Sequence, residues 1–178
     1  MSGQQAGQLP RTVQLRDGRT VLMRRVNPGD KSEFEAAFER LSSSSRYTRF
    51  FAPLLELPEQ MLEAAANPPA GQVVALVALA SEKADADIVG GARYAHVPPA
   101  GEACEFAVTV ADDWQGAGLA RHLMQTLIAL AQERGLRRME GHVLAENTGM
   151  RGLASRLGFT DVASPEEHTL RLVTLDLV

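Results

Sequence analysis

The sequence has few of the features that mark secreted or membrane proteins. Its 178 residues include a single cysteine, Cys104, so no internal disulfide can form and a reducing compartment fits best. No run approaches the roughly 20 apolar residues that are needed to span a bilayer. The first ten residues lack the charged and apolar regions of a signal peptide and are expected to form a flexible tail, which leaves residues 11–178 as one domain. We therefore expect a cytoplasmic protein with no membrane partner.

Clustered metal ligands and an excess of basic residues are also lacking. The histidines lie far apart, without the HExxH or paired spacing of metal sites, so we expect no metal. The formal net charge of −4 argues against nucleic acid as the main partner, although the many arginines leave room for a local basic groove.

Alternating apolar residues near the N-terminal end predict a β-hairpin. Two short alternating runs surround Asp17-Gly18, a pair that favours a type I′ turn in which both residues have φ > 0. Helical spacing follows over residues 27–41, where Asp30 or Ser32 could cap the helix. Two more helical segments are predicted over residues 42–51, behind a serine cap, and residues 57–69, where two prolines end the helix.

The remaining two thirds of the chain mixes strands with helices. Strands are predicted over residues 71–80, 86–97, 102–110, 136–144 and 167–177. Longer helices are predicted over residues 117–134, with Gly135 just after the end, and over residues 147–158. No internal repeat divides the chain, so the fold class is mixed α/β (α+β) with a largely antiparallel sheet.

A glycine-containing turn, QGAGLA, lies between the strand that ends at Val110 and the long helix that follows it. The first amides of a helix have no acceptor within the helix, and the helix dipole places about half a positive charge there. Glycines at such a turn let a phosphate approach the bare amides, and Arg121 could add a cation. On this pattern alone, an ordinary helix start with a flexible turn explains the glycines equally well.

The spacing of this turn distinguishes between phosphate loops. The chain has neither the GxxxxGK[ST] loop nor a GxGxxG dinucleotide loop. Gln115, Gly118 and Ala120 instead resemble the Q/R-x-x-G-x-G/A pyrophosphate loop of the GNAT superfamily of N-acetyltransferases. A second stretch, ENTGMRGLASRLGF, resembles that superfamily's other signature, in which Asn147 opens a helix that ends at Gly158-Phe159. Two motifs in the right order extend the resemblance over most of the chain.

This resemblance implies a GNAT fold, a mixed and mostly antiparallel central sheet with two splayed strands and flanking helices. Acetyl-CoA would be the co-substrate and would lie between the splayed strands, here CEFAVTV and RRMEGHVL. The strand backbone would bind the pantetheine arm and polarise the acetyl carbonyl, at Phe106, Val108 and Val110. The turn would hold the pyrophosphate, at Gln115, Gly116, Ala117, Gly118, Leu119, Ala120 and Arg121. Asn147 would bond the pantetheine amides, and Arg151 is either a phosphate contact or a solvated helix residue.

Direct attack by an amine on the thioester needs a base, because a lysine-type amine has a pKa near 10.4 and is protonated at neutral pH. Glu105 stands at the family's usual glutamate position, and burial among small and apolar residues would raise its pKa. A structural pairing with an arginine is the alternative reading of Glu105, and Glu102, Asp112 and His142 are lesser candidates. Ala154 replaces a tyrosine that many members use as a general acid, so Ser155, water or no acid at all serves here.

The acceptor is the least determined part of the prediction. The segment RYTRFF resembles the acceptor region of bacterial protein lysine acetyltransferases, which implies acceptor contacts from Arg46, Tyr47, Arg49 and Phe50. An amphipathic helix with two salt-bridging arginines explains the same residues. We expect transfer to a protein lysine, for example on an acyl-CoA synthetase. A small-molecule amine acceptor and a non-catalytic acetyl-CoA sensor stay open, and exposed strand edges near the C-terminus make a homodimer possible.

Overall fold

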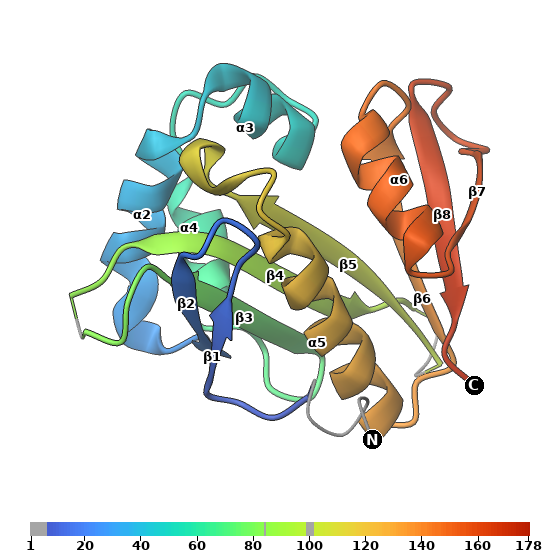
Figure 1. The fold of residues 1–178 in the computed structure, drawn as a ribbon. Helices are drawn as coiled ribbons and strands as arrows, with labels where there is room; N and C mark the ends of the chain where they lie inside the picture. Colours follow the sequence, from blue (N-terminus) through green and yellow to red (C-terminus); the bar gives the residue numbers. More distant parts are fainter. Residues whose placement is uncertain (1–6, 84, 99–101) are drawn as a thin grey trace.

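Eight strands form one sheet in the order β1-β2-β3-β4-β5-β6-β8-β7 (Figure 1). The computed structural model describes residues 7–83, 85–98 and 102–178. The strands are β1 (Arg11–Gln14), β2 (Thr20–Arg25), β3 (Val73–Leu79), β4 (Ile88–His96), β5 (Ala103–Val110), β6 (Arg138–Leu144), β7 (Thr160–Ala163) and β8 (Leu170–Asp176). The helices are α2 (Lys31–Arg40), α3 (Ser43–Phe50), α4 (Glu59–Ala66), α5 (Leu119–Glu133) and α6 (Thr148–Arg156), with short 3-10 turns η1 (Pro28–Asp30) and η2 (Asp112–Trp114).

The sheet is mixed and mostly antiparallel, as the sequence predicts. β5 and β6 are its parallel pair, whereas the other neighbouring strands run antiparallel. β7 was not predicted, because four residues directly after a helix are too few to show an alternating pattern.

The hairpin between β1 and β2 forms where it was predicted, but its turn is of another type. The Gly18 N–H donates to the Leu15 carbonyl at 3.0 Å, and the Leu15 N–H donates to the Arg19 carbonyl at 2.7 Å. Gly18 has φ +92°, whereas Asp17 does not have a positive φ. The loop therefore has three residues, a type I turn followed by a left-handed glycine, and not the two-residue type I′ turn expected.

Asp30 was expected to cap the first helix, and it has another role. Its carboxylate accepts two hydrogen bonds from Arg24, both 2.8 Å long, and one from the Asn27 N–H at 2.7 Å. It makes no side-chain hydrogen bond to the first turn of α2. The second helix does start as predicted, because Ser42 accepts a hydrogen bond from the Ser45 N–H at 3.1 Å.

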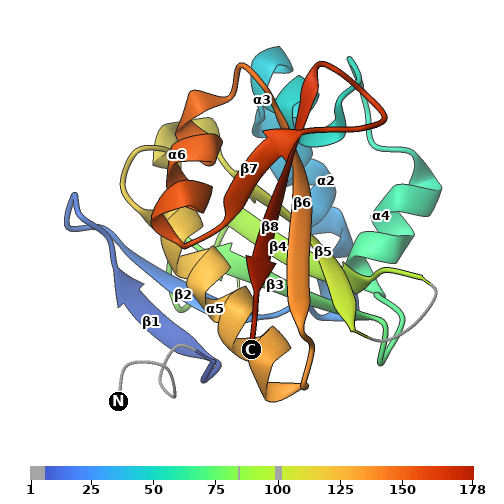
Figure 2. The ribbon, with the colours of Figure 1, turned by 90° about the vertical axis from the view of Figure 1, so that its right-hand side faces the viewer.

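Helices cover both faces of the sheet (Figure 2), with α5 and α6 on one side of the strands and α2 and α4 on the other. On the α5 side, Leu119, Leu123, Met124 and Leu127 are almost fully buried against strand residues such as Phe106. Each buried side chain of this size contributes about 1.5–3 kcal/mol. This helix therefore fixes the glycine-containing turn at its own N-terminus against the sheet.

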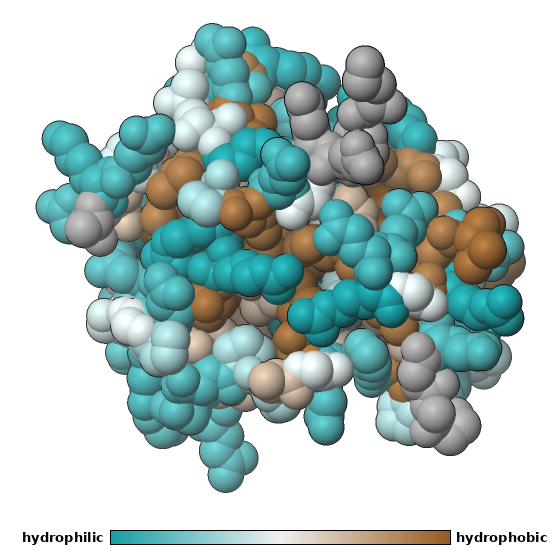
Figure 3. All heavy atoms as spheres, turned by 90° about the horizontal axis from the view of Figure 1, so that it is seen from below, coloured by the Kyte–Doolittle hydropathy of each residue, from teal (hydrophilic) through white to brown (hydrophobic). Residues whose placement is uncertain are grey.

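The expected flexible tail falls mostly on residues 1–6, which lie outside the described residues, while Leu9 packs against the core. Within the described ranges, none of the helices is long and apolar enough to cross a bilayer. At the end of the molecule where α5 and β8 finish, Figure 3 shows hydrophilic side chains lying across hydrophobic atoms, so the two kinds of surface are interspersed.

β5 and β6 pair over only a short stretch and then diverge (Figure 1). Their register joins Ala103 to Arg138, Cys104 to Met139 and Glu105 to Glu140, and it ends there. Beyond this point β5 continues with β4 alone as far as Val110. The divergence leaves one edge of β5 without a strand partner just before the turn that leads to α5.

Candidate active site

The free edge of β5 faces a large groove. The Ala111 N–H donates to the Val89 carbonyl across the pair with β4, while the Val110 carbonyl points the other way and accepts a bond from Gln115. Because backbone groups alternate in direction along a strand, the N–H and C=O groups of Val108 also point away from β4. Val108 and Val110 line the groove, as the prediction of a backbone binding surface requires.

Phe106 occupies the point at which the two strands part, and it does not line the groove. Its ring is buried, lies 5.5 Å from the ring of Phe159 and covers Gly141 on β6. A Cβ atom added at Gly141 would lie only 2.6 Å from the Phe106 Cζ atom. The aromatic ring therefore occupies the fork between β5 and β6, which makes its first role structural.

The turn between β5 and α5 presents its amides to the groove because its carbonyls accept hydrogen bonds from Arg16 on the other side. Gly116 and Gly118 have φ of +82° and +92°, in the left-handed region that favours glycine. The Arg16 N–H donates to the Ala117 carbonyl at 3.1 Å, and Arg16 Nη2 donates to the Gly116 carbonyl at 3.3 Å. In a trans peptide the N–H points opposite to the C=O, so the amides of Ala117 and Gly118 face away from Arg16.

Gln115 positions this turn and does not simply face solvent. Its Nε2 donates to the Val110 carbonyl at 3.0 Å and to Ser45 Oγ at 3.3 Å. Asp112 makes a second link to the same helix, accepting from the Ser42 N–H and from Ser45 Oγ, both at 3.1 Å. Burial acts to raise the pKa of Asp112, but these hydrogen bonds outweigh it and lower the pKa. The start of α3 is therefore tied to the predicted pyrophosphate turn.

The groove has a volume of about 1080 Å³ and carries positive charge, although the chain is acidic overall. No Asp or Glu is found among its lining residues, but Arg16, Arg49, Arg121 and Arg156 all line it. A cationic groove beside bare helix amides fits a ligand that carries several phosphates. Arg16 and Arg156 were not predicted, because only the fold brings the hairpin loop and the end of α6 to this turn.

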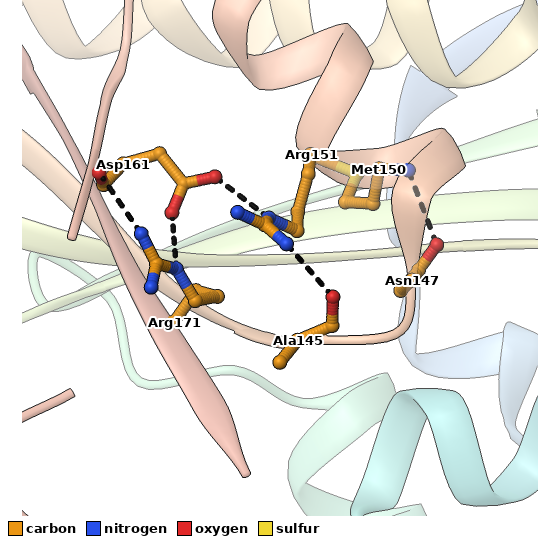
Figure 4. Close-up of polar contacts among 6 residues, drawn as sticks. All are labelled: Ala145, Asn147, Met150, Arg151, Asp161 and Arg171. Carbon is orange, nitrogen blue, oxygen red and sulfur yellow. Dashed lines mark hydrogen bonds and ion pairs between the residues drawn. The ribbon is translucent and has the colours of Figure 1, made fainter. Parts of the chain in front are cut away.

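Asn147 opens α6 as predicted and lines the groove. Its Oδ1 accepts a hydrogen bond from the Met150 N–H at 3.1 Å, which caps the helix (Figure 4). The oxygen is thus engaged by the helix, and the amide nitrogen is left as the donor for a ligand.

Arg151 does not reach the groove, so the expected phosphate contact has to be corrected. Its Nε donates to Asp161 Oδ2 at 2.8 Å, and its Nη1 donates to the Ala145 carbonyl at 2.9 Å (Figure 4). Asp161 also accepts from Arg171 Nε at 2.6 Å. Arg151 therefore joins α6 to β7 and to the end of β6. Arg156, on another face of the same helix, is the arginine of α6 that lines the groove.

Glu105 lies on the face of the sheet opposite to α5, and its expected burial is not observed. Its side chain is 48% exposed, because the alternation of β5 gives the buried face to Cys104 and Phe106. His142 of β6 approaches it, with 3.2 Å between His142 Nδ1 and Glu105 Oε1. Because no arginine makes an ion pair with it among the described residues, the alternative role as an arginine partner loses support. A carboxylate oriented by an imidazole beside the strand divergence is suited to accept a proton.

Ala154, which stands where many family members carry a tyrosine, is buried. Ala154 is 1% exposed and belongs to the core, so a larger side chain at this position would meet packed atoms. Ser155 is exposed and is not part of the groove lining. Neither residue is placed to serve as a general acid.

A second cavity, of about 240 Å³, lies between α2, α3, α4 and the sheet. Most of its lining is apolar, and Phe50 and Arg49 are part of it as the acceptor prediction requires. Arg49 and Thr109 line both the cavity and the groove, so the two spaces meet there. Tyr47 lies outside and is 43% exposed.

Arg46 was expected to bind the acceptor, but it holds α3 in place. Its guanidinium donates to the carbonyls of Phe38, Glu39, Leu54 and Leu55 and lies 4.2 Å from the centre of the Phe38 ring. The alternative of two salt-bridging arginines also fails, since within the described ranges neither Arg46 nor Arg49 makes an ion pair.

Known proteins resemble this chain over most of its length. Residues 34–159 match the family described as "Acetyltransferase (GNAT) family". Acetyltransferase PA5475 of Pseudomonas aeruginosa is 37% identical over 155 residues, which are 87% of this chain and 83% of that protein. Acetyltransferase Pat of Mycolicibacterium smegmatis is 32% identical over 152 residues, 84% of this chain but only 44% of Pat. The crystal structure of the GNAT domain of S. lividans PAT superimposes with a TM-score of 0.83 at 28% sequence identity. The match covers 93% of this chain and 96% of that domain.

Proposed function

The chain belongs to the GNAT family of acetyltransferases, and we propose that it transfers the acetyl group of acetyl-CoA to a protein lysine side chain. The observation that carries this proposal is the free edge of β5, which runs from Glu105 to the bare amides of the turn. One end of this edge offers a proton acceptor, and the other offers a phosphate site.

The fit of acetyl-CoA rests on three features of the groove. The amides of Ala117 and Gly118 face away from Arg16, so the turn can bind a pyrophosphate with no side chain in the way. The backbone of Val108 and Val110 matches the amide groups of a pantetheine arm. Arg16, Arg121 and Arg156 offset the charge of the phosphates. Acetyl-CoA supplies a thioester whose carbonyl carbon is open to attack.

The chain's own residues perform three tasks in the proposed reaction. Glu105 accepts the proton of the incoming ammonium group, so that a neutral amine attacks. His142, with a proton on Nδ1, donates to Glu105 Oε1 and fixes the direction of the carboxylate. The backbone at the end of the β5–β6 pairing donates to the carbonyl oxygen as it gains negative charge, which stabilises the tetrahedral intermediate. Departure of the thiolate needs no acid from this chain, because the thiolate takes up the second proton of the amine nitrogen as the amide forms. This agrees with the buried position of Ala154.

A protein acceptor is favoured by exposed apolar residues in the segment that supplies part of the second cavity's lining. Six large hydrophobic side chains are exposed among the described residues, and four of them fall between residues 47 and 61: Tyr47, Phe51, Leu55 and Met61. Met61 also lines the cavity. Clustered exposed apolar residues mark interaction surfaces, whereas single ones are common on any protein. A small free amine would need the cavity but not these four exposed residues, which we call the apolar rim.

The test is acetyl transfer by the wild type and by Glu105→Gln, followed as thiol release and by mass spectrometry of an acyl-CoA synthetase and of lysine peptides. Loss of the base lowers kcat by about 10²–10⁴-fold while the affinity for acetyl-CoA stays the same, and the pH dependence of the rate flattens. Glu35→Gln, at an exposed position of α2, is the matched control.

Three other results would each count against part of the proposal. A Glu105→Gln enzyme with an unchanged pH–rate profile removes Glu105 as the base. Activity on polyamines or drug amines alone removes the protein acceptor. Tight acetyl-CoA binding without any turnover favours an acetyl-CoA sensor.

A further inference from the structure

The second cavity, called the acceptor cavity from here on, is lined by two arginines and no acidic residue. Arg49, on α3, and Arg93, on β4, both line this apolar space, and they are its charged lining residues. Arg93 lies on the same face of the sheet as Glu105, because Ala95 pairs with Glu105 and Arg93 pairs with Ala107. Diagonal neighbours on paired strands lie about 7–8 Å apart. Arg93 is therefore close to the proposed base, but not in contact with it.

The guanidinium groups of Arg49 and Arg93 have no acceptor within the described residues. Among the described residues neither makes a hydrogen bond or an ion pair, and the Arg49 guanidinium lies 4.8 Å from the centre of the Phe50 ring. Other half-buried arginines of this chain are satisfied, since Arg24 binds Asp30 in a bidentate pair and Arg171 binds Asp161. Charged groups in a mostly apolar cavity are usually paired, so these two half-buried guanidinium groups are available to an anionic ligand.

The electrostatics support the same reading. Burial, and then the like charge of Arg93, lower the pKa of Arg49 to about 10. Arginine stays protonated at neutral pH even so, and two like charges face the same mostly apolar cavity. An anion bound between them would offset both the burial and the repulsion.

We propose that Arg49 and Arg93 bind a carboxylate of the acceptor, so that the acetylated amine is one that lies close to an acidic group. This inference rests on the proposed amine acetylation. The carboxylate has two possible sources, an acidic side chain beside a protein lysine or the α-carboxylate of a free amino acid. The exposed apolar rim favours the first source.

The cofactor is a weaker candidate for this anion. Arg49 lines both spaces, but Arg93 lines only the cavity, on the sheet face opposite to α5. The groove also has three other arginines and the helix amides for its phosphates. An effect of Arg93 on acetyl-CoA binding would therefore contradict the assignment.

The experiment compares lysine peptides that differ only in one neighbouring residue, Glu or Gln, at each position within three residues of the lysine. For the wild type, we expect kcat/KM to be at least tenfold higher with Glu at one or more positions. Arg93→Gln removes this preference without changing the KM for acetyl-CoA, whereas Arg137→Gln, at an exposed arginine outside the cavity lining, keeps it. In Arg93→Glu the preference reverses toward peptides with a neighbouring Lys.

Binding of the acetylated product peptides, measured by calorimetry, separates this inference from the proposed function because it needs no turnover. An enzyme without activity that still binds the Glu peptide at least tenfold more tightly than the Gln peptide contradicts acetyl transfer and supports the carboxylate site. Equal binding and equal rates for both peptides overturn the site, as does a raised KM for acetyl-CoA in Arg93→Gln. Acetylation of free amino acids, but not of their carboxamides, supports the site and assigns the carboxylate to the amino acid.

Discussion

Two arginines of α6 allow a direct test of where the acetyl-CoA phosphates bind. Arg151 joins α6 to Asp161 and to the Ala145 carbonyl, while Arg156 lines the groove. We expect Arg151→Gln to lower the stability of the fold and to leave acetyl-CoA binding nearly unchanged. Arg156→Gln should leave the stability of the fold nearly unchanged, because the Arg156 side chain is exposed and has no ion pair within the described ranges. It should weaken acetyl-CoA binding, because Arg156 lines the groove.

The size of the stability loss follows from the contacts that Arg151 makes. Hydrogen bonds to charged groups contribute about 1.5–3 kcal/mol when shielded, and exposed ion pairs contribute less than about 1 kcal/mol. The side chains of Arg151 and Asp161 are 32% and 22% exposed, which places this pair between those limits. Because Arg171 still holds Asp161 after the substitution, we expect a loss of about 1–2 kcal/mol. For a domain of this size that corresponds to a decrease in Tm of about 2–8 °C.

The same contact predicts how the difference depends on pH. Burial acts to raise the pKa of Asp161, but the hydrogen bonds from Arg151 and Arg171 outweigh it, so the folded-state pKa lies below 3.8. A carboxylate with a lowered pKa stabilises the fold above its unfolded pKa, and that contribution is lost as the pH falls through the folded value. The stability difference between wild type and Arg151→Gln should therefore be constant from pH 5 to 7 and shrink below about pH 4.

Chemical denaturation and the KM for acetyl-CoA measure the two effects separately. Loss of one phosphate contact in Arg156→Gln should raise the KM for acetyl-CoA by about tenfold, from a charge-assisted bond of about 1.4 kcal/mol. An Arg151→Gln variant of unchanged stability with a tenfold higher KM for acetyl-CoA would refute the reasoning. It would return Arg151 to the phosphate role that the sequence suggested.

Two further predictions concern the thiol leaving group and the strand fork. Ser155→Ala should change kcat by less than tenfold, because Ser155 lies outside the groove lining; a larger loss in steady-state assays would identify it as the general acid. Gly141→Ala should destabilise the fold by about 1–3 kcal/mol and raise the KM for acetyl-CoA, since its Cβ would overlap the Phe106 ring. Gly29→Ala, where a Cβ meets no atom within 4 Å, is the control, and equal unfolding curves for the two variants would contradict the packing argument.

Features that depend on residues close together in the chain could be predicted from the sequence. The turn at Gly116 and Gly118, the cap at Asn147 and the helix end at Gly158 are local, because each is determined by backbone conformations within a few residues. The exposure of Glu105 could also have been predicted. Cys104 and Phe106 both require the buried face, and a strand places the residue between them on the other face.

Features that depend on the relative placement of distant segments could not be predicted. Arg16 supports the turn from a hairpin loop that lies 100 residues away in sequence. Arg151 and Arg156 differ in rotation by about 140° around the helix axis, and only the packing of α6 decides which of them faces the groove. Arg49 and Arg93 come from different elements, so their shared cavity has no sequence signal.

The alternation of β5 explains why cofactor and acceptor meet on opposite sides of one strand. Its even-numbered residues from 106 to 110 turn their side chains toward the α5 core and their backbone groups toward the gap left by β6. Its odd-numbered residues place Glu105, Ala107 and Thr109 on the face with α2 and the acceptor cavity. A shift of one residue in register would bury Glu105 and expose Phe106, removing the base and opening the fork at once. The pairing of Glu105 with Ala95 and Glu140 therefore determines both the binding edge and the position of the proposed base.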